Sequence, residues 1–68
     1  MKGTECITWL EKKYGNLSNI IDYNKFIGRE VEIAYYNDYW AIEYNNEVLL
    51  DEEVLDLLLE EERLNNRG

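Results

Sequence analysis

The stretch "EIAYYNDYWAIE", residues 32–43, reads almost the same in both directions, and it decides the fold. On each side of Asn37-Asp38, aromatic and β-branched residues alternate with other residues, which is typical of strands. Asn and Asp tolerate the left-handed backbone that a two-residue hairpin turn requires. The stretch therefore predicts an antiparallel hairpin with strands over 30–36 and 39–44.

The two-residue turn also predicts the register, because pairing Tyr36 with Tyr39 sets every later pair. One face of the hairpin should be apolar and is formed by Val31, Ile33, Tyr35, Trp40, Ile42 and Tyr44. The other face should pair Tyr36 with Tyr39, Ala34 with Ala41, and Glu32 with Glu43. Two opposed glutamates repel. This second face is therefore left to solvent, covered by the first helix with Lys12 or Lys13 near the glutamates, or bound by a basic partner.

A third strand is expected over 48–50, which makes the sheet a three-stranded antiparallel meander. A three-residue loop, Asn45 to Glu47, would place Val48 and Leu50 on the apolar face. A two-residue loop would place Val48 beside Glu43 instead. We favour the three-residue loop because it keeps the apolar face continuous.

Helices are predicted on both sides of the sheet segment. Residues 4–14 show helical spacing of apolar residues, with Thr4 as N-cap and Gly15 as the stop. Residues 19–26 fit either a short helix capped by Ser18 or a loop with one turn. Asp51 should cap a helix over 52–64, and residues 65–68 should form a frayed tail. The apolar stripe of this last helix should cover roughly half of its circumference and consists of Val54, Leu55, Leu57, Leu58, Leu59 and Leu64.

These elements predict one α+β domain over residues 1–68. Its expected architecture is a small two-layer domain, with an N-terminal helix (alone or followed by a second short one), a three-stranded antiparallel β-meander and a C-terminal helix. The helices should cover the apolar face of the sheet. A chain of 68 residues can bury only a small core, so its stability should be modest.

The charge is distributed unevenly along the chain. The net charge is −8, yet residues 30–62 hold twelve acidic side chains and no basic one, whereas residues 1–29 carry a net charge of +2. Such a negative field repels nucleic acid and anionic membranes and attracts basic surfaces. We therefore expect a partner protein with a basic surface and no direct binding of nucleic acid or membrane. The simpler interpretation is that the charge keeps the protein soluble.

Residues suited to catalysis or metal binding are scarce. The chain has no histidine, and Cys6 lies on the apolar stripe of the first predicted helix without a histidine to activate it. The acidic run 51–62 has leucines at helical spacing, whereas a calcium loop needs oxygen ligands at alternate positions and a central glycine. We expect no enzymatic activity, no catalytic residue, no cofactor and no metal.

The sequence also bears on location. No apolar run approaches the ~20 residues that cross a bilayer, and the first residues lack the cleavage site of a signal peptide. One cysteine cannot form an internal disulfide, which agrees with a reducing compartment. We expect the protein to be cytoplasmic, in the host cell if a phage encodes it.

Two groups of residues are candidates for partner binding. On the last predicted helix, Glu53, Asp56 and Glu60 face outward, with Cα atoms rising in steps of roughly 4.5 and 6 Å, close to the spacing of successive phosphates. On the second face of the hairpin, two tyrosines and the carboxylates offer rigid contact area and negative charge. That second group consists of Glu32, Tyr36, Asp38, Tyr39 and Glu43.

In size, charge and tyrosine content, the chain resembles the very small acidic proteins with which bacteriophages block host nucleic-acid enzymes, namely anti-CRISPR proteins, anti-restriction proteins and uracil-DNA glycosylase inhibitors. The resemblance implies a non-enzymatic inhibitor that imitates DNA and covers a basic, nucleic-acid-binding surface of its partner. The alternative is a small structural or regulatory subunit that self-associates through exposed leucines of the last helix or through the free hairpin edge.

Overall fold

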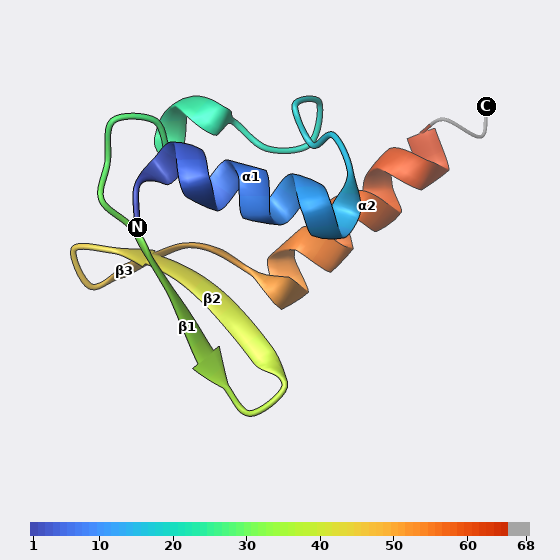
Figure 1. The fold of residues 1–68 in the computed structure, drawn as a ribbon. Coiled ribbons are helices and arrows are strands. Elements are labelled where there is room, and N and C mark those ends of the chain that lie inside the picture. Colours follow the sequence, from blue (N-terminus) through green and yellow to red (C-terminus); the bar gives the residue numbers. More distant parts are fainter. Residues whose placement is uncertain (66–68) are drawn as a thin grey trace.

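The computed structural model describes residues 1–65 and shows an α+β fold of two layers (Figure 1). Along the chain the elements are α1 (Gly3–Tyr14), the 3₁₀ turn η1 (Tyr23–Lys25), β1 (Glu32–Tyr36), β2 (Tyr39–Tyr44), β3 (Glu47–Asp51) and α2 (Glu52–Asn65). The strands form an antiparallel meander in the order β1-β2-β3. In Figure 1, α1 and η1 lie on one side of the sheet, and α2 extends away from the end of β3. The predicted fold class is confirmed.

The hairpin has the predicted register. All five pairs of β1 with β2 agree with the sequence, from Tyr36 opposite Tyr39 at the turn to Glu32 opposite Glu43 at the base. Asn37 has a φ of 62°, in the left-handed region that the turn requires. β1 begins at residue 32 rather than 30, because Glu30 and Val31 pair instead with the first two residues of the chain.

The predicted loop between β2 and β3 is wrong. The loop has two residues, Asn45 and Asn46, both with positive φ, so Val48 pairs with Glu43 and is exposed. A bulge at Leu49 then shifts the register by one residue, and Leu50 faces Ile42 as predicted. The bulge thus restores the continuous apolar face that the three-residue loop was meant to provide. β3 accordingly spans 47–51 rather than 48–50.

The start of α1 also differs from the prediction. The helix begins at Gly3, and Thr4 is not its N-cap. The Lys2 position caps the helix, and the Lys2 N–H donates to the Glu5 carboxylate at 2.9 Å. Met1 is held in extended pairing with Val31, so the extended segment before α1 is short and the helix begins at Gly3. At the other end, the Gly15 N–H donates to the Glu11 carbonyl, which confirms the predicted stop.

The segment 19–26 contains one turn rather than a longer helix. Only η1 is helical, and the Asp22 carboxylate caps it by accepting the Asn24 N–H at 3.0 Å. Ser18 caps nothing, because its N–H and hydroxyl both donate to the Asn16 side chain. The loop with one turn is therefore the correct alternative. The residue after this turn, Phe26, is buried in the core.

The core lies between the sheet and the layer formed by α1 and η1. Its buried residues are Cys6, Ile7, Leu10, Leu17, Phe26, Val31, Trp40, Ile42, Leu50 and Leu55. Trp40 meets Trp9 edge to face, with ring centroids 5.4 Å apart, and donates its indole N–H to the Tyr14 hydroxyl at 3.3 Å. Of the predicted apolar face, Ile33 and Tyr44 are partly buried, and Tyr35 is 64% exposed. Trp9 and Tyr14 pack on Trp40 at this end of the face, whereas Tyr35 lies on the edge strand and faces solvent.

α2 is anchored at its first turns only. The Asp51 carboxylate accepts the Val54 N–H at 2.8 Å, which confirms the predicted cap. Leu55 is fully buried, but Leu57 and Leu64 are more than half exposed, so the helix packs over a narrower stripe than predicted. Asn65 belongs to the helix, and the rest of the predicted frayed tail, residues 66–68, lies outside the described residues.

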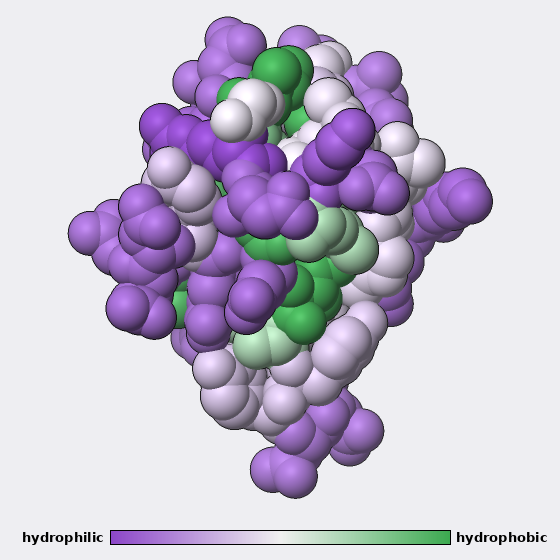
Figure 2. Space-filling model, turned by 60° about the vertical axis from the view of Figure 1, so that its left-hand side comes forward, coloured by the Kyte–Doolittle hydropathy of each residue, from purple (hydrophilic) through white to green (hydrophobic). Residues whose placement is uncertain are grey.

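One face of the molecule is shown in Figure 2 and is largely hydrophilic. On the face seen in Figure 2, hydrophilic side chains surround a small apolar patch. Within residues 1–65, no helix has the length and apolar character needed to span a bilayer.

Candidate functional site

The outer face of the hairpin, defined as Glu32, Ala34, Tyr36, Tyr39, Ala41 and Glu43, lies opposite the face that carries the core. α1 packs through Trp9 on Trp40, which belongs to the apolar face, so α1 does not cover the alanines. The interpretation that placed Lys12 or Lys13 over this face is therefore wrong. The Lys13 ammonium instead lies 5.1 Å from the Trp9 ring centroid, on the side of α1.

Tyr36 is already bonded to a carboxylate of its own chain. Its hydroxyl donates to Glu43 at 2.8 Å, which raises the pKa of Tyr36, first through that hydrogen bond and then through the negative charge. In the register, Ala34 and Ala41 lie between these two residues. The paired alanines therefore leave room for the Tyr36 and Glu43 side chains to reach each other. Tyr36 remains 55% exposed.

Tyr39 connects the hairpin to α2. Its pKa is raised to about 12, first by a hydrogen bond to the Asp51 carboxylate, then by loss of solvent, and then by the charges of Asp51, Glu53 and Glu52. Asp51 on β3 lies opposite Ala41 on β2. Ala41 follows Tyr39 by two residues and therefore lies on the same face of the sheet, so Asp51 is a diagonal neighbour of Tyr39. Asp51 therefore caps α2 and holds Tyr39 beside the first turn of that helix.

The structure brings Tyr39 and the acidic residues of α2 together around one shallow depression, which we call the α2 depression. Its volume is about 450 Å³, and it is lined by Tyr39, Glu52, Glu53, Asp56, Leu57 and Glu60. Leu57 is 62% exposed and supplies apolar surface among the carboxylates. A combination of carboxylates, a phenol ring and an aliphatic side chain suits the charged end and the methylene chain of a lysine or arginine.

A second depression lies at the base of the hairpin and holds the other predicted carboxylates. It is lined by Glu30, Glu32, Glu43, Tyr44, Asn45 and Asn46. Two positive groups lie near it: the terminal ammonium of Met1 is 3.2 Å from Glu30, and the Arg29 guanidinium is 5.0 Å from the Tyr44 ring centroid. This depression is therefore less negative than its carboxylates alone suggest.

Seven of the eight predicted residues thus fall into two groups. Tyr39, Glu53, Asp56 and Glu60 line the α2 depression, and Glu32 and Glu43 line the second depression, with Tyr36 bonded to Glu43. Asp38 is exposed in the hairpin turn and lines neither depression. Glu60 forms an ion pair with Arg63, which reduces the negative charge at the far end of the helix.

Sequence reasoning missed three residues of the α2 depression and its support, namely Asp51, Glu52 and Leu57. Asp51 was predicted only as a helix cap, because the bulge at Leu49 that places it opposite Ala41 was not foreseen. Leu57 was assigned to the buried stripe. A signal was present for Leu57: it lies one position from Asp56 and three from Glu60, and therefore at the boundary of the acidic side of the helix.

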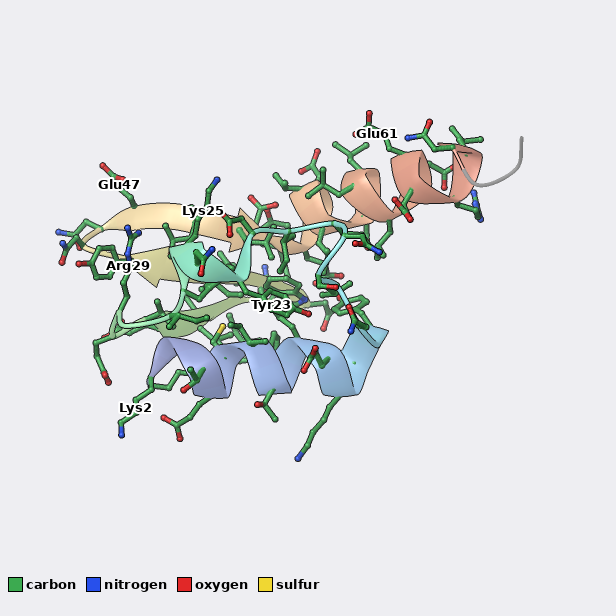
Figure 3. The ribbon with its side chains drawn as sticks, turned by 90° about the horizontal axis from the view of Figure 1, so that it is seen from above. Lys2, Tyr23, Lys25, Arg29, Glu47 and Glu61 are labelled. Carbon is green, nitrogen blue, oxygen red and sulfur yellow. The ribbon has the colours of Figure 1, made fainter. Side chains whose placement is uncertain are left out.

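Apart from Arg63, which pairs with Glu60 on α2, the basic side chains of the described residues lie on other elements. Figure 3 shows Lys2, Lys25 and Arg29 on the left-hand side of the view, together with Glu47, whereas Glu61 lies on the right-hand side near the far end of α2. The uneven charge of the sequence is therefore also uneven in space. One end of the molecule is mixed in sign, and the α2 end is negative.

The described residues offer little to catalysis or metal binding. Within residues 1–65, no group of three or more Cys, Asp or Glu side chains is placed to hold a metal ion. Cys6 is buried, and burial raises the pKa of its thiol to about 11, so the thiol stays protonated at neutral pH. A comparison with known proteins finds no match among family models, curated sequences or solved structures.

Proposed function

We propose that this protein is a non-enzymatic inhibitor that covers a basic, nucleic-acid-binding surface of a partner protein. The observation that carries the proposal is the α2 depression, where Glu52, Glu53 and Asp56 surround Leu57 beside Tyr39. A hydrophobic and aromatic centre with charges around it is the arrangement that gives interfaces both affinity and orientation. Such a surface would accept the arginines and lysines that otherwise contact phosphates.

The geometry of α2 supports the imitation of nucleic acid. Glu53, Asp56 and Glu60 follow one another at intervals of three and four residues within an unbroken helix. Their Cα atoms therefore rise in steps of roughly 4.5 and 6 Å, similar to the distance between phosphates along a strand. α2 is anchored by Leu55 near its start and extends away from the sheet, so its acidic side is accessible to a groove (Figure 1).

The hairpin contributes rigidity rather than free charge. The Tyr36 hydroxyl is bonded to Glu43, and the Tyr39 hydroxyl lies close enough to the Asp51 carboxylate to raise its pKa, so both rings are positioned before a partner arrives. Preorganised aromatic side chains lose little conformational entropy on binding. Bacteriophage inhibitors of nucleic-acid enzymes, which the chain resembles in size and charge, act in the host cytoplasm, where the single thiol of Cys6 would remain reduced.

The proposal can be tested by competition for nucleic acid. Host nucleic-acid enzymes recovered with the immobilised protein at low salt would be purified and incubated with a labelled DNA duplex, and the protein would be titrated in. We expect it to displace the duplex and to do so less well as salt rises, because both the steering and the contacts are electrostatic. The double variant Glu53→Lys, Asp56→Lys should displace the duplex at least about tenfold less well.

A matched control separates this surface from net charge. The double variant Glu47→Lys, Glu61→Lys changes the charge by the same amount at two exposed positions outside the α2 depression. It should displace the duplex within about threefold of the unchanged protein at moderate salt. Equal losses in the two double variants would mean that net charge alone acts, and a protein that binds the enzymes without displacing the duplex would contradict the blocking mechanism.

A further inference from the structure

We propose that a pocket beside α2 takes one bulky apolar side chain from a short amphipathic helix of the partner, whose arginines or lysines lie on the α2 depression. The inference rests on the proposed function and adds the kind of segment that the partner presents. The pocket, which we call the apolar pocket, has a volume of about 280 Å³. Its lining includes Ile20, Ile21, Phe26, Leu50, Val54 and Leu58.

The apolar pocket lies between two parts of the chain that are held by different elements. α2 packs on β2 and β3, whereas the segment 20–26 is bonded to α1 through Tyr23 and Glu11. Phe26 is buried, but Val54 is 44% exposed, so apolar surface of the pocket remains in contact with solvent. Its volume is slightly below the range of sites that enclose a whole small molecule, and it suits a single bulky side chain.

The apolar pocket and the α2 depression are neighbours on α2. Val54 lines the pocket, and Leu57, three residues later, lines the depression. Residues three apart on a helix have Cβ atoms about 5–6 Å apart, and the same spacing holds for residues three or four apart on a helix of the partner. One short helix can therefore place an apolar side chain in the pocket and a basic side chain among the carboxylates of the depression.

The charges around the two sites determine the occupant and its orientation. The α2 depression is lined by four carboxylates, of which only that of Glu60 pairs with a basic residue of α2, Arg63. The apolar pocket is lined by one acidic and one basic residue, Asp22 and Lys25, whose charges offset each other. Basic side chains of the partner therefore belong on the depression, and the pocket receives an uncharged one. A second copy of this chain is a poor occupant, because each copy carries a net charge of −8.

Two synthetic peptides test this arrangement. Each is an alanine-based helix of about 16 residues that carries one phenylalanine, two arginines and a fluorescein label. In the first peptide the arginines follow the phenylalanine by three and four residues and share its face; in the second they follow by two and five residues and lie on the opposite face. Fluorescence anisotropy should show that the first peptide binds at least about tenfold more tightly. Equal affinities, or no binding of the first peptide, would overturn the inference.

The variant Val54→Ser tests the apolar pocket without a change of charge. Val54 is exposed in the first turn of α2, so the fold should tolerate the change. The affinity for the first peptide should fall about fivefold, whereas that for the second should stay within about twofold. Val48→Ser is the matched control, because Val48 is 55% exposed on β3 and lines neither site. Equal losses in the two variants would contradict a contact at the pocket.

The DNA-displacement assay separates this inference from the proposed function. Val54→Ser should also displace the duplex less well than Val48→Ser does. If the double variant Glu53→Lys, Asp56→Lys loses displacement while Val54→Ser keeps it, the apolar pocket is not used and the proposed function stands. If the unchanged protein does not displace the duplex, the proposed function fails, whereas a preference for the first peptide that Val54→Ser removes still supports the pocket.

Discussion

The first 31 residues and the rest of the chain use their polar groups differently. In the first part, polar groups form hydrogen bonds between segments of that part. The Tyr23 hydroxyl joins α1 to the following loop, and the Gly3 N–H donates to the Arg29 carbonyl at 2.8 Å. In the second part, carboxylates lie at the surface around the α2 depression. The contrast indicates that the first part stabilises the fold over the hairpin, whereas much of the second part is free to serve a partner.

Gly3→Ala tests the tightest contact of the first part and should have the largest effect. A Cβ atom at Gly3 would lie 1.6 Å from the Phe26 carbonyl oxygen, and that oxygen belongs to backbone, which cannot rotate away as the end of a flexible side chain can. The helix and the loop would have to separate, at a cost of at least about 2 kcal/mol. Because a domain of this size has only a few kcal/mol of stability, the variant should be largely unfolded.

The measurement is urea denaturation followed by circular dichroism, with Thr4→Ala as control. Thr4 is the next residue of the same helix turn and is exposed, so its side chain can be removed within about 0.5 kcal/mol. A Gly3→Ala protein with the midpoint of the control would show that α1 and the Phe26 backbone are not in close contact.

Tyr23→Phe removes the polar connection of the first part and should have an intermediate effect. The Tyr23 hydroxyl accepts the Leu17 N–H and donates to the Glu11 carboxylate, each at 2.9 Å. The variant leaves the Leu17 N–H without its partner beside a fully buried side chain, which should lower the free energy of unfolding by about 1–2 kcal/mol.

The control for Tyr23→Phe is Tyr35→Phe. It removes the same atom from an exposed ring in the second part, and the unfolding midpoint should hardly change. If the two variants lost equal stability, the distinction between the inward-bonded part and the exposed part would be wrong.

The hairpin was predictable from sequence because all its information is local. Asn37 supplies the left-handed turn, and once Tyr36 meets Tyr39, every other pair follows. The same signal was present at Asn45 and Asn46, which both take positive φ. The preference for a continuous apolar face led to the wrong loop, since a strand can restore its register by a bulge as well as by a longer loop.

The candidate site was predictable residue by residue but not as an arrangement. Charge and helical spacing were enough to select Glu53, Asp56 and Glu60. The bond of Tyr36 to Glu43 and that of Tyr39 to Asp51 join residues that are not opposite each other, so they depend on the twist of the sheet and on the bulge. Alternation along the strands assigns residues to a face but does not show which side chains reach one another diagonally.

The interaction between Tyr39 and Asp51 can be tested through the pH dependence of stability. Its loss should have the smallest effect on the free energy of unfolding, because the ring is at the surface. The pKa of Tyr39 is about 12 in the folded protein, against an ordinary value of 10. As pH rises, the unfolded chain therefore loses its tyrosine proton first. The contribution of Tyr39 to stability is complete below about pH 10 and is lost as the pH rises toward 12. Tyr36 and Tyr23, whose pKa values are also raised, add to the same decline.

The variant Tyr39→Phe isolates this contribution. Tyrosinate absorbance, recorded against pH for the unchanged protein and for the variant, should differ by one group that ionises near pH 12. The decline in the urea midpoint between about pH 10 and 12 should be shallower in the variant, because one late-ionising group is gone. If instead the missing group ionised near pH 10, Tyr39 would not be held against Asp51 and α2. The α2 depression would then lose the aromatic side on which the proposed contact with a basic partner depends, and the second part of the chain would present its carboxylates without a fixed framework.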